Sequence, residues 1–180
     1  MPRLPEVLNR DALPEDKRDL FEYLIKTRGS VRAPFSYIMH SPEAAARVAH
    51  TGTYVRFESS LPKVITELAT LATARHFDCA YEWGAHAALA RAAGVRPEAI
   101  DAIGTREVSG LPEEESLPVR YAWDLLQHHK VSDTLFDAAH AAYGDQGVMD
   151  LTVTVGYYAL LACVLNAIEV VPAPEAARLP

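Results

Sequence analysis

Apolar residues recur at three- and four-residue intervals along most of the chain, which is the pattern of helices with one buried face. In the segment after Pro62, for example, the apolar positions include Val64, Leu68 and Leu71. We find no run of alternating apolar and polar residues joined by hairpin-turn residues. The pattern therefore predicts an all-α fold.

Proline and glycine mark where the predicted helices begin and end. Proline is favoured at the first helical position, and glycine is favoured just after the last one. A polar N-terminal arm (about 1–14) and a proline-rich C-terminal tail (about 171–180) are expected to lie outside the helices, the tail being extended or mobile. Between them, the signals predict helices over about 16–28, 42–51, 97–103, 110–129 and 132–143, a helix starting near Pro62, another ending at Gly94, and a last one after a break at Gly144.

The last predicted helix, over residues 151–168, contains no charged residue. A membrane-spanning helix needs about 20 predominantly apolar residues and is usually flanked by Lys or Arg. Here Asp150 and Glu169 bound the run closely, and Asn166 lies within it. We therefore expect no membrane association, but a helix buried at the centre of the fold or between subunits.

Length and composition predict one domain over residues 1–180, because 49% of the residues are apolar and 23% are charged. The formal net charge of −7 and the lack of a basic run argue against a nucleic-acid partner. Cys79 and Cys163 form neither a disulfide framework nor a zinc-type spacing, which favours a reducing compartment. The N-terminal residues include prolines and acids where a signal peptide would be apolar, so we expect a cytoplasmic protein.

The candidate chemistry is concentrated in one short segment. Cys79, Glu82 and His86 lie at positions i, i+3 and i+7, so in a helix their side chains would point the same way. Glu67 lies upstream on the same side of its segment as Val64 and Leu71, where a carboxylate is costly unless it is paired. We expect these four proton-exchanging groups to share one cavity.

A buried carboxylate has a raised pKa, which would suit Glu82 to exchange protons near neutral pH. A nearby imidazolium would lower the pKa of Cys79, whereas burial beside two carboxylates would raise it, so both states stay open. Tyr81 and Trp83 are expected to shape a substrate site or to support its helix. A purely structural network of the same residues is the alternative.

A metal site is a weaker interpretation of the same segment. Glu82 and His86 at i and i+4 could both reach one ion, but a soft thiolate combined with hard carboxylates matches no single preferred metal. The other histidines supply no better ligand set. We therefore predict neither a metal nor another cofactor.

Three motifs resemble the carboxymuconolactone decarboxylase family, which includes the alkyl hydroperoxide reductase D group. They are ELATLA at 67–72, CAYEWGAH at 79–86 and AAGV at 92–95, and the resemblance is strongest over about 60–103. The turn at 144–147 and the helix at 151–168 also look like the long single-domain members. The resemblance implies an all-α fold that assembles as a homo-oligomer, a trimer or hexamer, with the motif helix lining a pocket near a subunit interface.

In the peroxidase branch of this family, two cysteines separated by two residues form the redox couple, assisted by a histidine and an upstream glutamate. By resemblance, Cys79 takes the first cysteine position, Glu67 that of the glutamate and His86 that of the histidine. Glu82, however, occupies the second cysteine position. A disulfide-cycling peroxidase needs a resolving thiol, and only Cys163 remains, if the fold brings it close. This substitution favours acid/base chemistry.

The leading hypothesis is a cofactor-independent enzyme that acts by proton transfer on a small carboxylated or lactone substrate, by decarboxylation or isomerisation. Glu82 and His86 would be the acid/base pair, Glu67 would relay protons, and Cys79 would be a hydrogen-bonding thiol or an occasional nucleophile. One alternative is a thiol peroxidase that reacts through Cys79. Another is a noncatalytic oligomeric protein that binds a small ligand.

Overall fold

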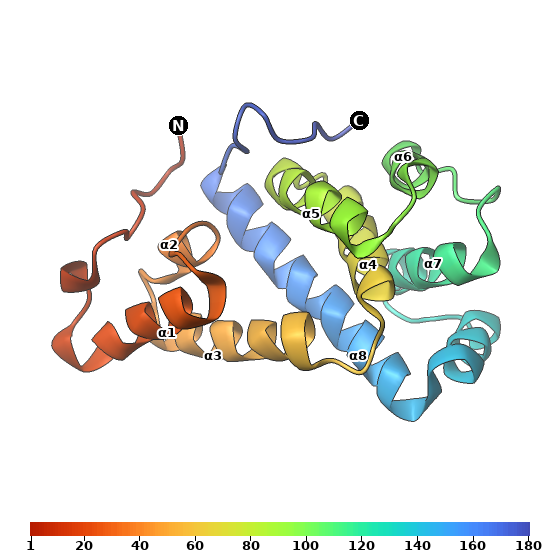
Figure 1. Cartoon of the computed structure of the whole chain (residues 1–180), viewed down its shortest axis with the longest axis horizontal. Helices are drawn as coiled ribbons and strands as arrows, with labels where there is room; N and C mark the ends of the chain where they lie inside the picture. Colours follow the sequence, from red (N-terminus) through yellow and green to blue (C-terminus); the bar gives the residue numbers. More distant parts are fainter.

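The computed structural model describes residues 1–180 and consists of helices without strands, which confirms the predicted all-α fold. In Figure 1 the long helix α8 crosses the middle of the molecule, with α1–α3 on one side and α4–α7 on the other. The elements are η1 (Arg10–Ala12), η2 (Glu15–Lys17), α1 (Arg18–Arg28), α2 (Phe35–Ile38), α3 (Pro42–Thr53), η3 (Tyr54–Glu58), α4 (Lys63–His76), α5 (Ala80–Ala93), α6 (Pro97–Thr105), α7 (Glu113–His128) and α8 (Asp133–Ile168).

Most helix ends lie where proline and glycine predict them. Pro42 and Pro97 occupy the first positions of α3 and α6. Gly29 and Gly94 follow α1 and α5 in the left-handed conformation, with φ of 76° and 96°. Glycine adopts this conformation without the steric cost that a Cβ would impose. The short helices η1, α2 and η3 were not predicted.

Helix α8 is broken at Gly144, where φ is 68° and ψ is −178°. The break after Tyr143 is therefore confirmed, but the helix resumes before residue 151, so that Asp150 lies inside it. By length and composition α8 could cross a membrane, which is weak evidence because core helices pass the same test. In this fold 44% of its most apolar stretch is buried against other elements.

Helix α4 forms the centre of the larger half of the molecule. It packs against α5, α7 and α8, and Leu68, Leu71 and Ala72 are completely buried. Because neighbours surround α4 on several sides, residues of more than one face are inaccessible. Glu67 is among them, at 2% exposure, which makes a polar partner necessary.

The N-terminal helices form a separate small core that rests on α8. Leu24, Met39, Ala45 and Ala49 pack together in it, and α3 contacts α8. This arrangement brings the end of α1, the loop before α2 and η3 to one side of α5.

The connection from η3 to α4 is tied to α8 by Asp150. Its carboxylate accepts hydrogen bonds from the Tyr54 hydroxyl at 2.8 Å, the Ser59 hydroxyl at 3.1 Å, and the Ser60 amide and hydroxyl at 2.8 and 2.7 Å. Asp150 therefore fixes the segment that carries Arg56.

The C-terminal tail contains no helix, makes one turn at residues 174–176, and packs over α5 and α6 (Figure 1). At Gly84 an added Cβ would lie 2.9 Å from the Cβ of Ala176, and at Gly104 it would lie 2.7 Å from Cγ of Pro180. Contacts this short exclude larger side chains without a shift of the tail. Glycine at these two positions lets the tail lie directly on the helices.

Candidate active site

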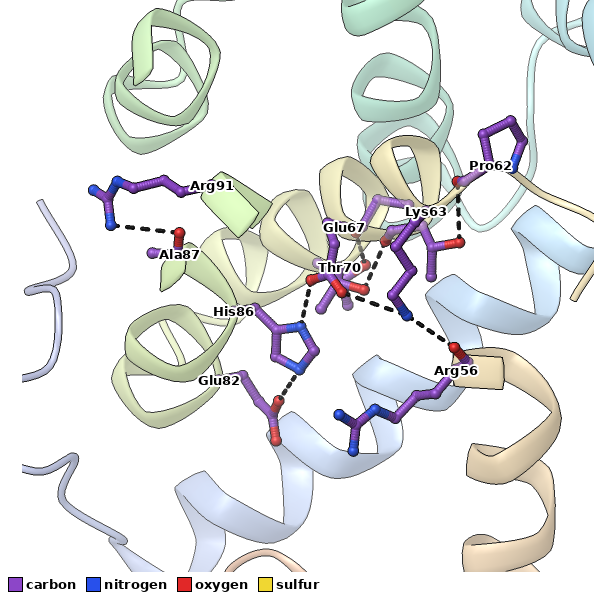
Figure 2. A network of polar contacts seen from close by, with 12 residues as sticks. Arg56, Pro62, Lys63, Glu67, Thr70, Glu82, His86, Ala87 and Arg91 are labelled. Carbon is purple, nitrogen blue, oxygen red and sulfur yellow. Dashed lines mark hydrogen bonds and ion pairs between the residues drawn. The ribbon is translucent and has the colours of Figure 1, made fainter. Parts of the chain in front are cut away.

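A chain of three buried side chains joins α4 to α5. The Nδ1 atom of His86 lies 2.7 Å from Oε2 of Glu67, and its Nε2 atom lies 3.3 Å from Oε2 of Glu82. Figure 2 shows the imidazole between the two carboxylates, with Glu67 reaching it from α4 and Glu82 lying one turn before it on α5. The structure therefore brings together three of the four predicted groups.

The three side chains of this Glu67–His86–Glu82 chain are shielded from solvent. Glu67, Glu82 and His86 are 2%, 3% and 6% exposed. The ring of Tyr158 contacts the imidazole edge-to-face, with centroids 4.8 Å apart. At the Glu67 end, Nζ of the exposed Lys63 lies 3.7 Å from Oε1. Charges this well shielded interact more strongly than charges in water.

The two carboxylates set the protonation of His86. Burial by itself lowers the pKa of the imidazole, but hydrogen bonds to Glu67 and Glu82 outweigh this effect and raise the pKa to about 9. His86 is therefore an imidazolium at neutral pH, and both of its ring nitrogens are donors.

A cavity of about 80 Å³ opens beside this chain. Tyr81, Glu82 and His86 of α5 form one wall, and Tyr157 and Tyr158 of α8 form part of another. Typical ligand pockets measure about 300–1,000 Å³, so this cavity suits a small molecule. Burial raises the pKa of Tyr157 to about 12, which keeps its hydroxyl protonated and able to donate.

The prediction that Cys79 shares this cavity is wrong. Helix α5 begins at Ala80, and Cys79 precedes it with non-helical backbone angles, so the expected i, i+3, i+7 alignment does not form. Its side chain is completely buried in an apolar cluster with Ala33, Tyr37, Ala162 and Leu165, and it is absent from the cavity lining. Burial raises the pKa of the thiol to about 11, which keeps it protonated at neutral pH.

The two aromatic residues of the motif have different surroundings. Tyr81 lines the cavity, and its hydroxyl donates to the carbonyl of Ala33 at 3.3 Å. Trp83 is 2% exposed within the largest apolar cluster and contributes nothing to the cavity. Of the two roles expected for Trp83, support of its helix fits this position and substrate contact does not.

The remaining thiol does not line the cavity. Cys163 is exposed on α8, and both cysteines are free. No group of three or more His, Cys, Asp or Glu side chains is arranged to hold a metal ion.

Sequence reasoning missed the third wall of the cavity, which belongs to the N-terminal part of the chain. Arg28, Arg32, Phe35 and Arg56 line it, together with residues 33 and 34. The spacing of these arginines shows no regular pattern, because they come from α1, a loop and η3. The only sequence feature that pointed to this wall was the short loop segment at 29–31, which begins with Gly29 and Ser30 and has an arginine on each side, Arg28 and Arg32.

Residues 42–116 match the model of the carboxymuconolactone decarboxylase family, a region that contains Glu67, Glu82 and His86. No curated protein sequence matches the chain significantly.

Solved structures share the fold over nearly the whole chain. A peroxidase-related protein from Ralstonia eutropha with an alkylhydroperoxidase AhpD core has a TM-score of 0.79 and 22% identity over 97% of this chain and 93% of its own. A peroxidase-related protein from Silicibacter sp. has a TM-score of 0.76 and 18% identity over 97% and 95%. A protein of unknown function from Agrobacterium tumefaciens has a TM-score of 0.69 and 20% identity over 77% and 97%.

The order of the motifs, the helical fold and the match over residues 42–116 point to one conclusion. Residues 42–116 match the carboxymuconolactone decarboxylase family, and the chain has the helical fold of AhpD-like proteins.

Proposed function

We propose that this protein is a cofactor-independent enzyme that performs acid/base chemistry, decarboxylation or isomerisation, on a small carboxylated or lactone substrate. The observation that carries this proposal is the Glu67–His86–Glu82 chain, whose His86 and Glu82 end lines a small cavity. Such an arrangement supplies both a proton acceptor and a proton donor at the same place.

The roles follow from the position of each group. Glu82 lines the cavity, so its carboxylate is placed to take a proton from a carbon next to a carbonyl group. The imidazolium of His86 hydrogen-bonds to Glu82 and can return a proton to the substrate carbon or oxygen. Glu67 holds the imidazole from the far side and keeps it charged. In an isomerisation one proton is removed from the substrate and one is returned, so no net proton is gained or lost. In a decarboxylation the C–C bond breaks, CO₂ leaves, and the electron pair left on the substrate carbon takes the proton of His86, which solvent then replaces.

Proton exchange with solvent can be measured before the natural substrate is identified. In D₂O, the wild type should exchange the protons next to the carbonyl of at least one member of a panel of small oxo acids and lactones, followed by NMR. His86→Gln and Glu82→Gln should lower the rate by about 10²–10⁴-fold, the usual contribution of a general acid or base. Ser30→Ala, which changes another cavity residue without a titratable group, is the matched control. Exchange or turnover that persists in both variants would exclude this site.

A thiol peroxidase that reacts through Cys79 is the second candidate, because two of the similar solved structures are described as peroxidase-related. The position of Cys79 argues against it, since the thiol is buried, protonated and outside the cavity. We expect Cys79→Ala to keep most of its acid/base activity. Peroxide consumption with a thiol reductant that disappears in this variant would support the peroxidase instead.

A noncatalytic role in binding a small ligand is the third candidate. It predicts that a ligand raises the melting temperature while no member of the panel is exchanged or converted. That combination would contradict the proposed enzyme.

A further inference from the structure

The cavity beside His86 has one strongly cationic wall. Arg28, Arg32 and Arg56 all line it, whereas Glu82 is its only acidic lining residue. Glu82 already contacts His86. Three arginines therefore line a space in which no carboxylate of the protein is left to balance their charge.

None of these three arginines takes part in an ion pair. The ion pairs of the chain all join other residues. This is informative because the formal net charge is −7, so acidic partners are plentiful elsewhere on the molecule. The concentration of unpaired positive charge is therefore local to the cavity.

Arg28 is held in place but is incompletely satisfied. Its two terminal nitrogens donate to Oγ1 of Thr27 at 2.7 Å and to the carbonyl of Ala49 at 2.8 Å. Its guanidinium also lies over the ring of Phe35, 4.6 Å from the centroid. Its Nε atom, however, is buried without a hydrogen-bond partner, and such a donor normally has an acceptor.

Arg56 lines the cavity from η3, whereas Arg28 belongs to α1. Figure 2 shows its side chain extending from η3 toward the side on which Glu82 and His86 lie. No hydrogen bond engages its guanidinium, although its backbone carbonyl accepts one from Lys63 at 2.8 Å. The hydrogen bonds of Asp150 to Tyr54 and Ser60 fix the segment around it, so the group is positioned without being neutralised.

We propose that Arg28, Arg32 and Arg56 form an anion subsite that binds a carboxylate of the substrate, and that the natural substrate is a small organic acid rather than a neutral lactone. Guanidinium groups suit this task because their donors match the two oxygens of a carboxylate. The reacting carbon would then lie toward Glu82 and His86, a part of the inference that rests on the proposed function. Arg28 and Arg32 precede the family-matched residues 42–116, so the N-terminal segment would determine substrate selection.

Binding of matched ligands tests the subsite without any turnover. Titration calorimetry would compare acetate, propionate, succinate and the neutral succinamide on the whole protein, with inorganic phosphate as a second kind of anion. We expect a carboxylate to bind the wild type at least about tenfold more tightly than the diamide, and Arg56→Gln to weaken that binding by about 10- to 100-fold. Arg32→Gln should have a smaller effect because Arg32 is exposed.

Two further variants separate the subsite from general effects of charge and folding. Arg28→Lys keeps the charge but loses the forked donors, so it should weaken carboxylate binding while the circular dichroism spectrum stays unchanged. Arg91→Gln is the matched control, because Arg91 is an exposed arginine of α5 outside the cavity and without an ion pair. It should bind as the wild type does.

The outcomes that would overturn the subsite are distinct from those that would overturn the enzyme. Equal binding of acid and diamide, no binding of any carboxylate, or unchanged binding by Arg56→Gln would exclude the subsite. Tighter binding of phosphate than of every carboxylate would exclude the substrate class. Arginine-dependent carboxylate binding with no exchange or conversion in the whole panel would leave the subsite standing and reject the proposed function.

Discussion

At the scale of single residues, His86 owes its properties to two neighbours on different helices. Its imidazole is almost inaccessible, and burial alone would favour the neutral form. Glu67 and Glu82 reverse that preference by accepting hydrogen bonds from the charged form. Because both carboxylates raise the pKa of His86, the three residues act as a unit.

The raised pKa of His86 makes stability depend on pH. A histidine with a folded-state pKa of about 9 and an unfolded value of about 6.5 stabilises the fold fully below pH 6.5. That contribution is lost as the pH rises from about 6.5 to 9. Urea denaturation should show a fall in the free energy of unfolding across this window, and His86→Gln should lack that component. Equal pH profiles for the two proteins would contradict the raised pKa.

The position of Cys79 shows that the exact start of a helix can change a chemical interpretation, because α5 begins one residue after it. As a member of α5 it would have faced the cavity, but as the residue before the helix it packs among apolar side chains. With the pKa of its thiol near 11, Cys79 is protonated at neutral pH. Glu82, three residues after Cys79, is the acidic residue that reaches the cavity.

At the scale of elements, the active site depends on how η3 and α4 are attached to α8. Asp150 accepts four hydrogen bonds from Tyr54, Ser59 and Ser60. These bonds outweigh the effect of burial and lower the pKa of Asp150. They also hold the stretch between Arg56 and Lys63, next to Glu67.

Replacing Asp150 should therefore weaken both the fold and the subsite. Asp150→Ala leaves the hydroxyl and amide donors without an acceptor, and we expect the free energy of unfolding to fall by about 3 kcal/mol. Urea denaturation measures this loss, and Asp101→Ala on the exposed surface of α6 is the control. A loss equal to that of the control would show that the cluster contributes nothing to stability.

The break in α8 gives a second test at this scale. Gly144 has φ of 68° and ψ of −178°, a combination essentially restricted to glycine, and a Cβ there would meet no atom within 4 Å. Gly144→Ala should cost about 1–3 kcal/mol through backbone strain alone. Gly110→Ala, at an equally open position without a positive φ, should be nearly neutral in the same thermal or urea melt. Similar melting of both variants would refute the strain.

At the scale of the whole molecule, α8 joins the two halves and still leaves an apolar stripe uncovered. Met149, Val153, Gly156, Leu160 and Cys163 are exposed and follow one another at intervals of four and three residues. This spacing is that of a helical seam that packs against another helix. We propose that the stripe packs against a second copy of the chain, in keeping with the homo-oligomer that the family resemblance implies.

The assembly can be tested without disturbing the cavity. Leu160→Asp places a charge in the stripe, so it should shift the sedimentation velocity profile toward a monomer while the helical content is unchanged. Leu89→Asp, on an exposed face of α5, is the control and should sediment as the wild type. A wild type that is monomeric at high concentration would exclude the seam.

The sequence by itself determined the longer helices, most of their proline and glycine boundaries, and the pairing of Glu82 with His86, because these depend on neighbours within a few residues. It also indicated that Glu67 needs a partner, since a carboxylate in an apolar face is costly. Only the tertiary structure decided that Cys79 turns away from the cavity and that Arg28, Arg32 and Arg56 line it. Those placements depend on how α1 and η3 dock on α5 and α8, and contacts between segments so distant in the chain leave no periodic signal in the sequence.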